Sequence, residues 1–344
     1  MGEGGTAIQA SGDVTITGMS AQDALAIIDY ANKNALAHYT AEARSTVEKL
    51  FEELSEKLVD RLFTPGEGNP EALRDPDFQF LIGEAKESYA RSGDPAVAET
   101  LVDIIARRSE AKTHSREALT LNEAAVRAPR LTKPEFAELS LAYLIRHTAE
   151  NTITNLGLFH AYLTGKLMPF VDNISLDSPS YWHIEAQGCG RLNSISRLSF
   201  HSALVQRYGG FLGRGSTLAE LENNAPEGSK HLVKEIVVPC LRDHAKFQPN
   251  AANQAVLEAT VKAKGWEAQL AIGVWSQYAS TIPPSDDELI AMLKPDVPGI
   301  EKLFKVWAEG PFASLELNSV GIAIGHANAV RVVGFNAPLS LWIK

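Results

Sequence analysis

Cysteine is scarce in this sequence: Cys189 and Cys240 are the only two among 344 residues. Two cysteines cannot build the disulfide framework of a small secreted protein, so we expect a reducing compartment. The sequence also lacks an apolar run of the roughly 18–20 residues that a membrane-spanning helix requires. Its first residues lack the basic and apolar regions of a secretory signal. We therefore expect a cytoplasmic protein with no membrane span.

Positive charge is also in short supply. The chain has 32 Lys and Arg residues against 42 Asp and Glu residues, for a formal net charge of -10. Phosphate backbones and anionic lipid surfaces repel such a chain, which disfavours general binding to nucleic acid or membranes. With 45% hydrophobic and 22% charged residues, the composition is nevertheless that of a globular protein.

The sequence motifs of common enzyme classes are missing. There is no G-x-S-x-G, no H-E-x-x-H, no Rossmann glycine fingerprint and no set of kinase motifs. These patterns therefore assign no catalytic residue and no cofactor, and they favour a protein that is not an enzyme. A site assembled from distant residues would leave no such trace, so the question of catalysis stays open at this point.

The chain does contain many helical patterns, which predict a mainly α-helical bundle. Ser20 and Asp23 begin a helix that runs without proline or glycine to about Phe63, before Pro65 ends it. At about 1.5 Å per residue, this helix would be about 65 Å long. Residues 43–62 carry apolar side chains at spacings of three and four, which predicts a seam with another helix, in this chain or in a second copy. The seam consists of Ala43, Val47, Leu50, Leu54, Leu58 and Leu62.

Small β-containing units are expected at both ends of the chain. Residues 6–17 contain two β-prone runs around a glycine-containing turn, which predicts a β-hairpin. An isolated hairpin is marginally stable, so this one should dock on the protein or on another copy of it. Near the other end we predict a strand over 314–318, a helix over 320–333 that ends at Gly334, and a strand over 338–343. This β-α-β unit would be similar to part of a winged helix.

These patterns divide the chain into four expected parts. They are a hairpin arm (1–19), a helical domain with the long helix (20–148), a second helical domain (149–310) and a small α+β module (311–344). Further helices are predicted wherever apolar residues recur at helical spacing, whereas residues 173–187 should form a loop or short strands. The further helices cover about 77–91, 95–111, 115–126, 132–147, 150–170, 191–208, 217–224, 228–247, 251–265 and 285–308, the last broken near Pro295 and Pro298.

The glycine-rich run Gly209–Thr217 is the strongest local signal for a ligand site. Gly210 and Gly215 have the spacing of a phosphate-binding loop, in which backbone N–H groups bind the anion. Ser216 stands where such a loop requires lysine, so Arg214 would have to supply the positive charge. The alternative is a tight turn between two helices.

Basic residues concentrate in the segment 181–215, where four arginines accompany a single acid, Glu185. Aromatic residues occur in the same segment, and the combination could bind an anionic ligand or nucleic acid. Alternatively, the arginines pair with acids elsewhere in the fold. The arginines are Arg191, Arg197, Arg207 and Arg214, and the aromatic residues include Trp182, Phe200, Tyr208 and Phe211.

Three residues are weak candidates for zinc ligands. His183-Ile-Glu185 and Pro239-Cys240 partly match the zinc deaminases, which require H-x-E and P-C-x-x-C. The second cysteine of that pattern is missing here, but Cys240 and His244 would share one helical face. The candidate set is therefore His183, Cys240 and His244. The alternative is a buried structural cysteine with surface histidines.

The predicted C-terminal helix could in principle enter a DNA groove. It is apolar almost all round, and only His326, Asn328 and Arg331 could contact bases. A helix of this composition is more often buried. Binding to nucleic acid is therefore the less favoured interpretation.

The run Gly4-Gly-Thr-Ala-Ile-Gln-Ala-Ser-Gly-Asp-Val-Thr-Ile16 resembles a tag shared by many bacterial proteins of unknown function. Other short stretches resemble one uncharacterised bacterial family that carries this tag. The pattern Leu317–Gly321 is also similar to the ending of abortive-infection proteins, although Asn318 stands where those have threonine. The resemblance implies a bacterial stress or anti-phage setting and supplies no catalytic residue. The other stretches are 75–79, 121–125, 131–132, 188–190, 208–210, 317–325 and 341–343.

These observations favour a self-associating helical sensor or adaptor in bacterial defence. Residues 6–17 and the seam over 43–62 would mediate a homo-oligomer, and a further protein partner is conceivable. The first alternative is an effector enzyme that binds a nucleotide or anion with the Gly209–Thr217 loop and the nearby arginines. The second alternative is a nucleic-acid-binding protein.

Overall fold

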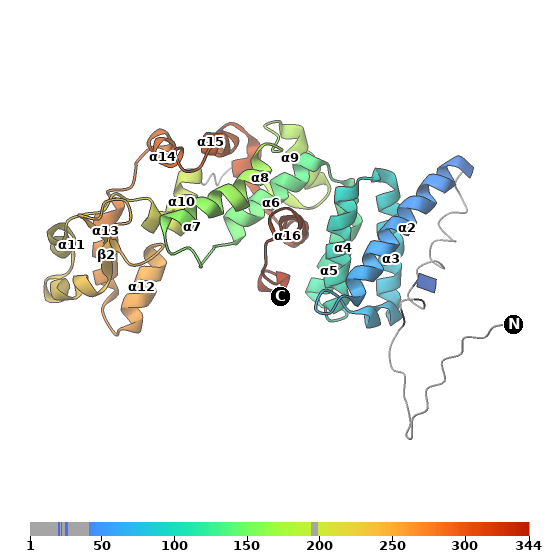
Figure 1. Ribbon diagram of the computed structural model, residues 1–344, viewed down its shortest axis with the longest axis horizontal. Helices are drawn as coiled ribbons and strands as arrows, with labels where there is room; N and C mark the ends of the chain where they lie inside the picture. The colour runs from blue at the N-terminus through green and yellow to red at the C-terminus, as the bar shows by residue number, and fades with distance from the viewer. Residues whose placement is uncertain (1–19, 21, 23–24, 27–40, 194–198, 344) are drawn as a thin grey trace, which may run out of the picture. The chain divides into compact units, whose positions relative to one another are not determined.

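The computed structural model describes residues 20, 22, 25–26, 41–193 and 199–343 (Figure 1). In these ranges the protein is mainly α-helical with two small antiparallel sheets, which confirms the predicted fold class. The chain divides into two compact units, residues 1–113 and 114–344. The boundary between these two units lies between residues 113 and 114. The predicted hairpin and most of residues 20–40 lie outside the described residues.

The described part of the first unit consists of three helices and one short 3-10 helix. Local caps set their boundaries: the Asp75 side chain accepts a hydrogen bond from the N–H of Asp77, and a proline follows each of the caps Asp75 and Asp94. Gly93 ends one helix in the left-handed conformation, with φ of 60°. The elements are α2 (Ala41–Phe63), η2 (Pro70–Arg74), α3 (Pro76–Ser92) and α4 (Pro95–Glu110).

Most of the apolar seam of α2 is buried within this unit, whereas Ala43 is exposed and Leu50 is half-buried. Leu54, Leu58 and Leu62 are at most 1% exposed, and α2 packs along α3 and α4 (Figure 1). These two helices therefore cover the side chains that were expected to contact a second copy. The buried part of the seam is therefore an intramolecular contact within this unit.

The second unit is organised around α16 (Ser319–Val333), which packs against α5 (Arg116–Arg127) and α6 (Lys133–His147). A Cβ atom on Gly321 would lie only 1.8 Å from the carbonyl oxygen of Cys189, so glycine is required for this close approach. Gly334 ends α16 in the left-handed conformation, as predicted. Residues 321–329 are all buried. Of the three residues considered for base contacts, His326 and Asn328 are therefore buried, and Arg331 is exposed.

The predicted C-terminal β-α-β unit is wrong in its last strand. The strand β4 (Leu315–Leu317) pairs antiparallel with β1 (Gly190–Leu192), which lies far earlier in the chain. The end of the chain instead forms the 3-10 helix η8 (Leu339–Leu341), beside which the Trp342 indole N–H donates to the carbonyl of His147. A six-residue apolar run alone cannot distinguish a strand from such a docked turn.

The helix predicted over 228–247 is also wrong. The chain forms the 3-10 helix η6 (Glu227–Glu235) and then the strand β2 (Val237–Pro239), which pairs with β3 (Phe247–Pro249). Two adjacent valines favour a strand, and Pro239 has no N–H group for a continuing helix. These local preferences outweigh the helical spacing of the apolar residues.

Two helices were not predicted. The first is α13 (Ala268–Ala279), whose Gly273 interrupts the helical pattern but allows close contact with the carbonyl of Asn224. The second is α9 (Ser178–Ala186), in the segment where a loop or strands were expected. This helix has no strong apolar stripe that could be recognised in the sequence. Polar contacts with α6 hold it in place instead.

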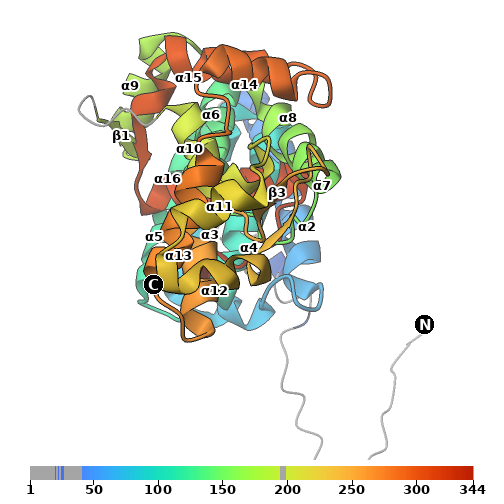
Figure 2. The ribbon, with the colours of Figure 1, turned by 90° about the vertical axis from the view of Figure 1, so that its left-hand side faces the viewer.

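The remaining helices lie within the ranges that the sequence predicts. In Figure 1, α11, α12, α13 and β2 lie together at one end of the second unit, and Figure 2 looks onto this end. None of the helices in the described ranges has the length and hydrophobicity needed to cross a bilayer. The remaining helices are α7 (Leu156–Tyr162), η4 (Leu163–Leu167), α8 (Met168–Val171), α10 (Phe200–Tyr208), α11 (Leu218–Asn224), α12 (Gln254–Ala263), α14 (Asp286–Leu293) and α15 (Ile300–Glu309).

Candidate functional site

The loop Gly209–Thr217 joins α10 to α11 and is packed tightly against the rest of its unit. A Cβ atom on Gly210 would lie 2.1 Å from the carbonyl oxygen of Ala251. A Cβ atom on Gly213 would lie 2.5 Å from the ring of Tyr278. The glycines therefore bring the loop against neighbouring protein atoms, which occupy the space that a phosphate would need.

Internal hydrogen bonds also use the N–H groups of this loop. The N–H of Gly210 donates to a carbonyl just before α12, and the N–H of Gly213 donates to the Tyr278 hydroxyl over 3.0 Å. Ser216 is buried and exchanges two backbone hydrogen bonds with Phe247. A phosphate site needs several converging N–H groups without such partners. The interpretation as a tight turn between helices therefore fits this geometry better.

The conformation at Gly215 has a similar structural explanation. Its φ of +76° is one that other residues rarely adopt, and a Cβ atom there would lie 2.8 Å from Cβ of Cys240. The neighbouring Arg214 side chain is exposed. Thr217 then caps α11 with a capping box completed by Glu220.

The predicted arginines do not gather into one site among the described residues. Arg191 pairs with Glu316 across the β1–β4 sheet, with 2.8 Å between nitrogen and oxygen. The guanidinium of Arg207 donates to two backbone carbonyls at the C-terminal end of α6. Arg214 lies in the glycine-rich loop, and Arg197 falls outside the described residues. The alternative of separate structural partners thus holds for Arg191 and Arg207.

The three weak zinc candidates do not come together either. Nδ1 of His183 lies 2.6 Å from a carboxylate oxygen of Glu135. Cys240 is buried, with its sulfur 3.8 Å from the carbonyl oxygen of Gly213. Within the described residues, no group of three or more His, Cys, Asp or Glu side chains could hold a metal. The set His183, Cys240 and His244 is therefore not a metal site.

Two buried carboxylates on α6 hold α9 against it. Glu135 accepts a hydrogen bond from the N–H of Thr132, which completes the capping box of α6, and it also contacts His183. Glu138 is fully buried and accepts from the N–H of Ser175 and the hydroxyl of Ser180. Burial raises the pKa of Glu138 to about 7. Its contacts are all internal, so it anchors the structure and no substrate reaches it.

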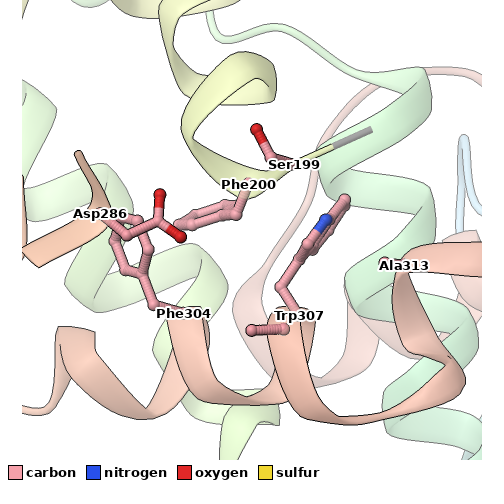
Figure 3. A pocket seen from close by; sticks show the side chains of 7 residues that line it. Ser199, Phe200, Asp286, Phe304, Trp307 and Ala313 are labelled. Carbon is pink, nitrogen blue, oxygen red and sulfur yellow. The ribbon is translucent and has the colours of Figure 1, made fainter. Parts of the chain in front are cut away.

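A hollow of about 160 Å³ lies among α10, α14 and α15 (Figure 3). Its inner wall is formed by the rings of Phe200, Phe304 and Trp307, each at most 4% exposed. Asp286 and Ser199, which are exposed, lie at its mouth. We call this feature the aromatic pocket.

Local sequence signals place these side chains. Phe304 and Trp307 are three residues apart on α15, so both project from one face of the helix. Ser199 caps α10, which puts Phe200 at the first helical position. The cap of α14 likewise places Asp286 in its first turn. The pocket thus forms where two helix starts meet the aromatic face of a third helix.

The rings are inclined to one another. The Phe200 and Phe304 rings have centroids 4.9 Å apart and planes at 80°, whereas Phe200 and Trp307 are separated by 5.5 Å and 38°. The guanidinium of Arg146 lies 5.2 Å from the Trp307 centroid and donates to the carbonyl of Ala313 over 2.6 Å. Burial lowers the pKa of Arg146. Arg146 does not line the pocket.

A larger hollow of about 460 Å³ lies between residues 150–154 and the β2–β3 region. Two of its polar side chains already have internal partners. Glu150 accepts from Thr152, and Gln248 bonds to the N–H of Leu241 and the carbonyl of Gly210. The aromatic pocket, where three rings meet one carboxylate, is therefore the stronger candidate.

The sequence alone pointed to only one of the aromatic residues of this pocket. Phe200 appeared among the aromatic residues of the arginine-rich segment, but Phe304, Trp307 and Asp286 were not singled out. The available signal was the pair of aromatic residues on one face of an amphipathic helix. That pattern also describes an ordinary core helix, so it could not identify a pocket.

The fold and the pocket together define a mainly helical protein of two units with a small cavity lined by aromatic rings. A protein-family model described only as “:-like” matches residues 18–343, so the chain belongs to that family. No curated protein and no solved structure matches the chain. The family description names no activity, and the functional argument therefore depends on the geometry.

Proposed function

We propose that this protein is a self-associating helical sensor or adaptor that works by binding and not by catalysis. The observation that carries the proposal is the contrast between its reactive groups and its pocket. The candidate reactive groups all have partners within the protein. These groups are the amides of Gly210 and Gly213, the Glu135–His183 pair and Cys240. The aromatic pocket, by comparison, is open to a ligand.

The proposed self-association now depends on residues 6–17, because α3 and α4 cover the seam of α2. A β-prone arm that cannot stand alone gains stability by pairing with another copy. The resemblance of residues 4–16 to a bacterial tag, and of residues 317–321 to abortive-infection proteins, supports a setting in stress or anti-phage defence. The anion-binding enzyme has less support, since the amides of the glycine-rich loop already have partners. The nucleic-acid-binding protein has less support, since most of α16 is buried.

The test is the absolute mass in solution, measured by light scattering after size exclusion at micromolar concentration. The full chain should form a defined oligomer of the 37.3 kDa protomer. A variant lacking residues 1–18 should be a monomer with unchanged helical circular dichroism per residue. A strictly monomeric full chain would refute self-association, and an oligomeric truncation would refute the role of the arm.

A further inference from the structure

We infer that the aromatic pocket binds a methylated ammonium group, with Asp286 as its counter-charge. This inference rests on the proposed binding function and names the ligand class of that site. A methylated ammonium carries its positive charge on a rounded, largely apolar surface. The aromatic lining, the shape, the charge and the volume of the pocket all support this assignment.

The lining of the pocket suits a cation with an apolar surface. Three of its seven residues are aromatic, namely Phe200, Phe304 and Trp307. Aromatic faces attract cations through the ring quadrupole, and clusters of such rings recognise quaternary ammonium groups. A strongly hydrated inorganic ion would lose its water shell here, because the pocket wall offers few oxygen atoms in return.

The shape of the pocket favours a rounded group over a flat one. The Phe200 ring is nearly perpendicular to Phe304 and inclined by 38° to Trp307. Rings at these angles form a corner, whereas a flat aromatic ligand would need a slot between parallel rings. A tetrahedral ammonium group can contact all three rings at once.

Charge at the pocket has the matching sign. Among the residues that the structure describes, Asp286 is the only charged one that lines the pocket, and Figure 3 shows its carboxylate beside the rings of Phe200 and Phe304. Two further acids, Asp287 and Glu288, follow in the first turn of α14. An anionic ligand would be repelled at this mouth.

Arg146 is a positive charge near the pocket that opposes a cation, as do the partial positive charges at the starts of α10 and α14. It lies over the Trp307 ring without lining the pocket. Its guanidinium donates to the carbonyl of Ala313. Burial lowers the pKa of Arg146, and the attraction of the Glu316 carboxylate opposes part of that shift. Arg146 is therefore turned toward partners outside the pocket, whereas Asp286 lines it.

The size of the pocket also fits. A cavity of about 150 Å³ accommodates a benzene molecule, and this hollow measures about 160 Å³. A trimethylammonium head is smaller than that limit and leaves its fourth substituent to point outward. The fourth substituent could belong to a free small molecule such as choline or to a trimethylated lysine in a peptide.

The experiment titrates the full chain with choline by isothermal calorimetry and by saturation-transfer NMR. The matched neutral probe is 3,3-dimethylbutan-1-ol, in which carbon replaces the charged nitrogen. We expect choline to bind at least about tenfold more tightly than this alcohol, because cation–π and carboxylate attractions act on the charge alone. A short peptide with trimethyllysine, tested beside its unmethylated form, distinguishes the two sources of the group.

Two variants locate the binding. Asp286→Asn should weaken choline binding about tenfold and leave the alcohol unchanged, because it removes only the counter-charge. Asp287→Asn is the matched control, since it removes the same charge one residue away and does not line the pocket. Choline affinity should be unchanged in that control.

Each other outcome overturns the inference in a distinct way. Equal binding of choline and the alcohol would leave an apolar pocket without cation selectivity. Equal loss in both variants would place the cation elsewhere, and no binding of either probe or of the methylated peptide would remove the site. Light scattering on the same samples reports self-association independently, so a failure of the ligand assignment is distinguishable from a failure of the proposed function.

Discussion

The glycine-rich loop and the aromatic pocket lie in the same unit and reverse the expectations that their sequences raise. Gly209–Thr217 has the composition of a ligand-binding loop, yet Ala251, Tyr278 and Cys240 fill the space beside its glycines. The pocket is built from Phe304 and Trp307, which have the spacing of ordinary core residues, yet it is hollow.

The difference has a simple physical origin. Glycine allows a backbone to approach anything closely, and the sequence does not tell whether the neighbour is a phosphate or the protein itself. Large rings that meet at steep angles pack imperfectly, so a corner of three rings can leave space that smaller side chains would fill. A filled loop should be sensitive to any added atom, whereas the mouth of a pocket should tolerate change.

The strongest test of the filled loop is Gly210→Ala. Its new Cβ atom would lie 2.1 Å from a backbone oxygen, which cannot move as a flexible side chain can. We expect a loss of about 3 kcal/mol or more in the free energy of unfolding, measured by urea denaturation. Gly228→Ala is the control, because a Cβ atom there has no neighbour within 4 Å. Equal, small effects in both variants would mean that the loop has spare room.

A second test concerns the other filled region, around the buried Glu138. Burial raises its pKa from 4.5 to about 7, so folding favours the protonated form. Its contribution to stability is therefore full below pH 4.5 and is lost as the pH rises to about 7. A shift of this size corresponds to about 3 kcal/mol.

Glu138→Gln keeps the shape of this side chain and removes its titration. The stability of the variant relative to the native protein should therefore rise by about 3 kcal/mol between pH 4.5 and 8. Urea denaturation at several pH values measures this difference. A difference independent of pH would show that the carboxyl is solvated or already charged in the fold.

Tyr278→Phe should have a smaller effect on the loop. The hydroxyl accepts from the N–H of Gly213 and donates to the carbonyl of Gly210, over 3.0 and 2.9 Å. Its removal leaves the buried N–H of Gly213 without this partner, whereas the carbonyl of Gly210 keeps its hydrogen bond from Gln248, so we expect a cost of about 2 kcal/mol in urea denaturation. If the cost were below about 0.5 kcal/mol, water would have replaced the hydroxyl, and the loop would not be as tightly filled as its contacts indicate.

Much of the helical fold could be predicted from sequence because caps and breaks are local. The helices predicted over 95–111 and 132–147 begin within a residue of their predicted starts, and Gly334 ends α16 as predicted. The interruption near Pro295 also separates α14 from α15. These signals depend on neighbouring residues only, so no knowledge of the tertiary structure is needed.

The errors arose where distant residues decide the structure. β4 pairs with β1 and not with the end of the chain, and Gly273 is compatible with a helix because another segment packs against it. The pocket depends likewise on α10 meeting α15. The sequence of either helix alone does not predict that the two helices pack together.

The smallest expected effect belongs to Asp286→Asn at the mouth of the pocket. The residue is exposed, and its main local role is to place negative charge at the start of α14, worth at most about 0.5 kcal/mol at such a surface. Asp287→Asn removes the same helix-end charge, so the two variants should unfold at the same urea concentration. A clearly larger loss for Asp286→Asn would mean that its carboxylate is part of the packed structure. The pocket would then resemble the glycine-rich loop, and the contrast between the two regions would disappear.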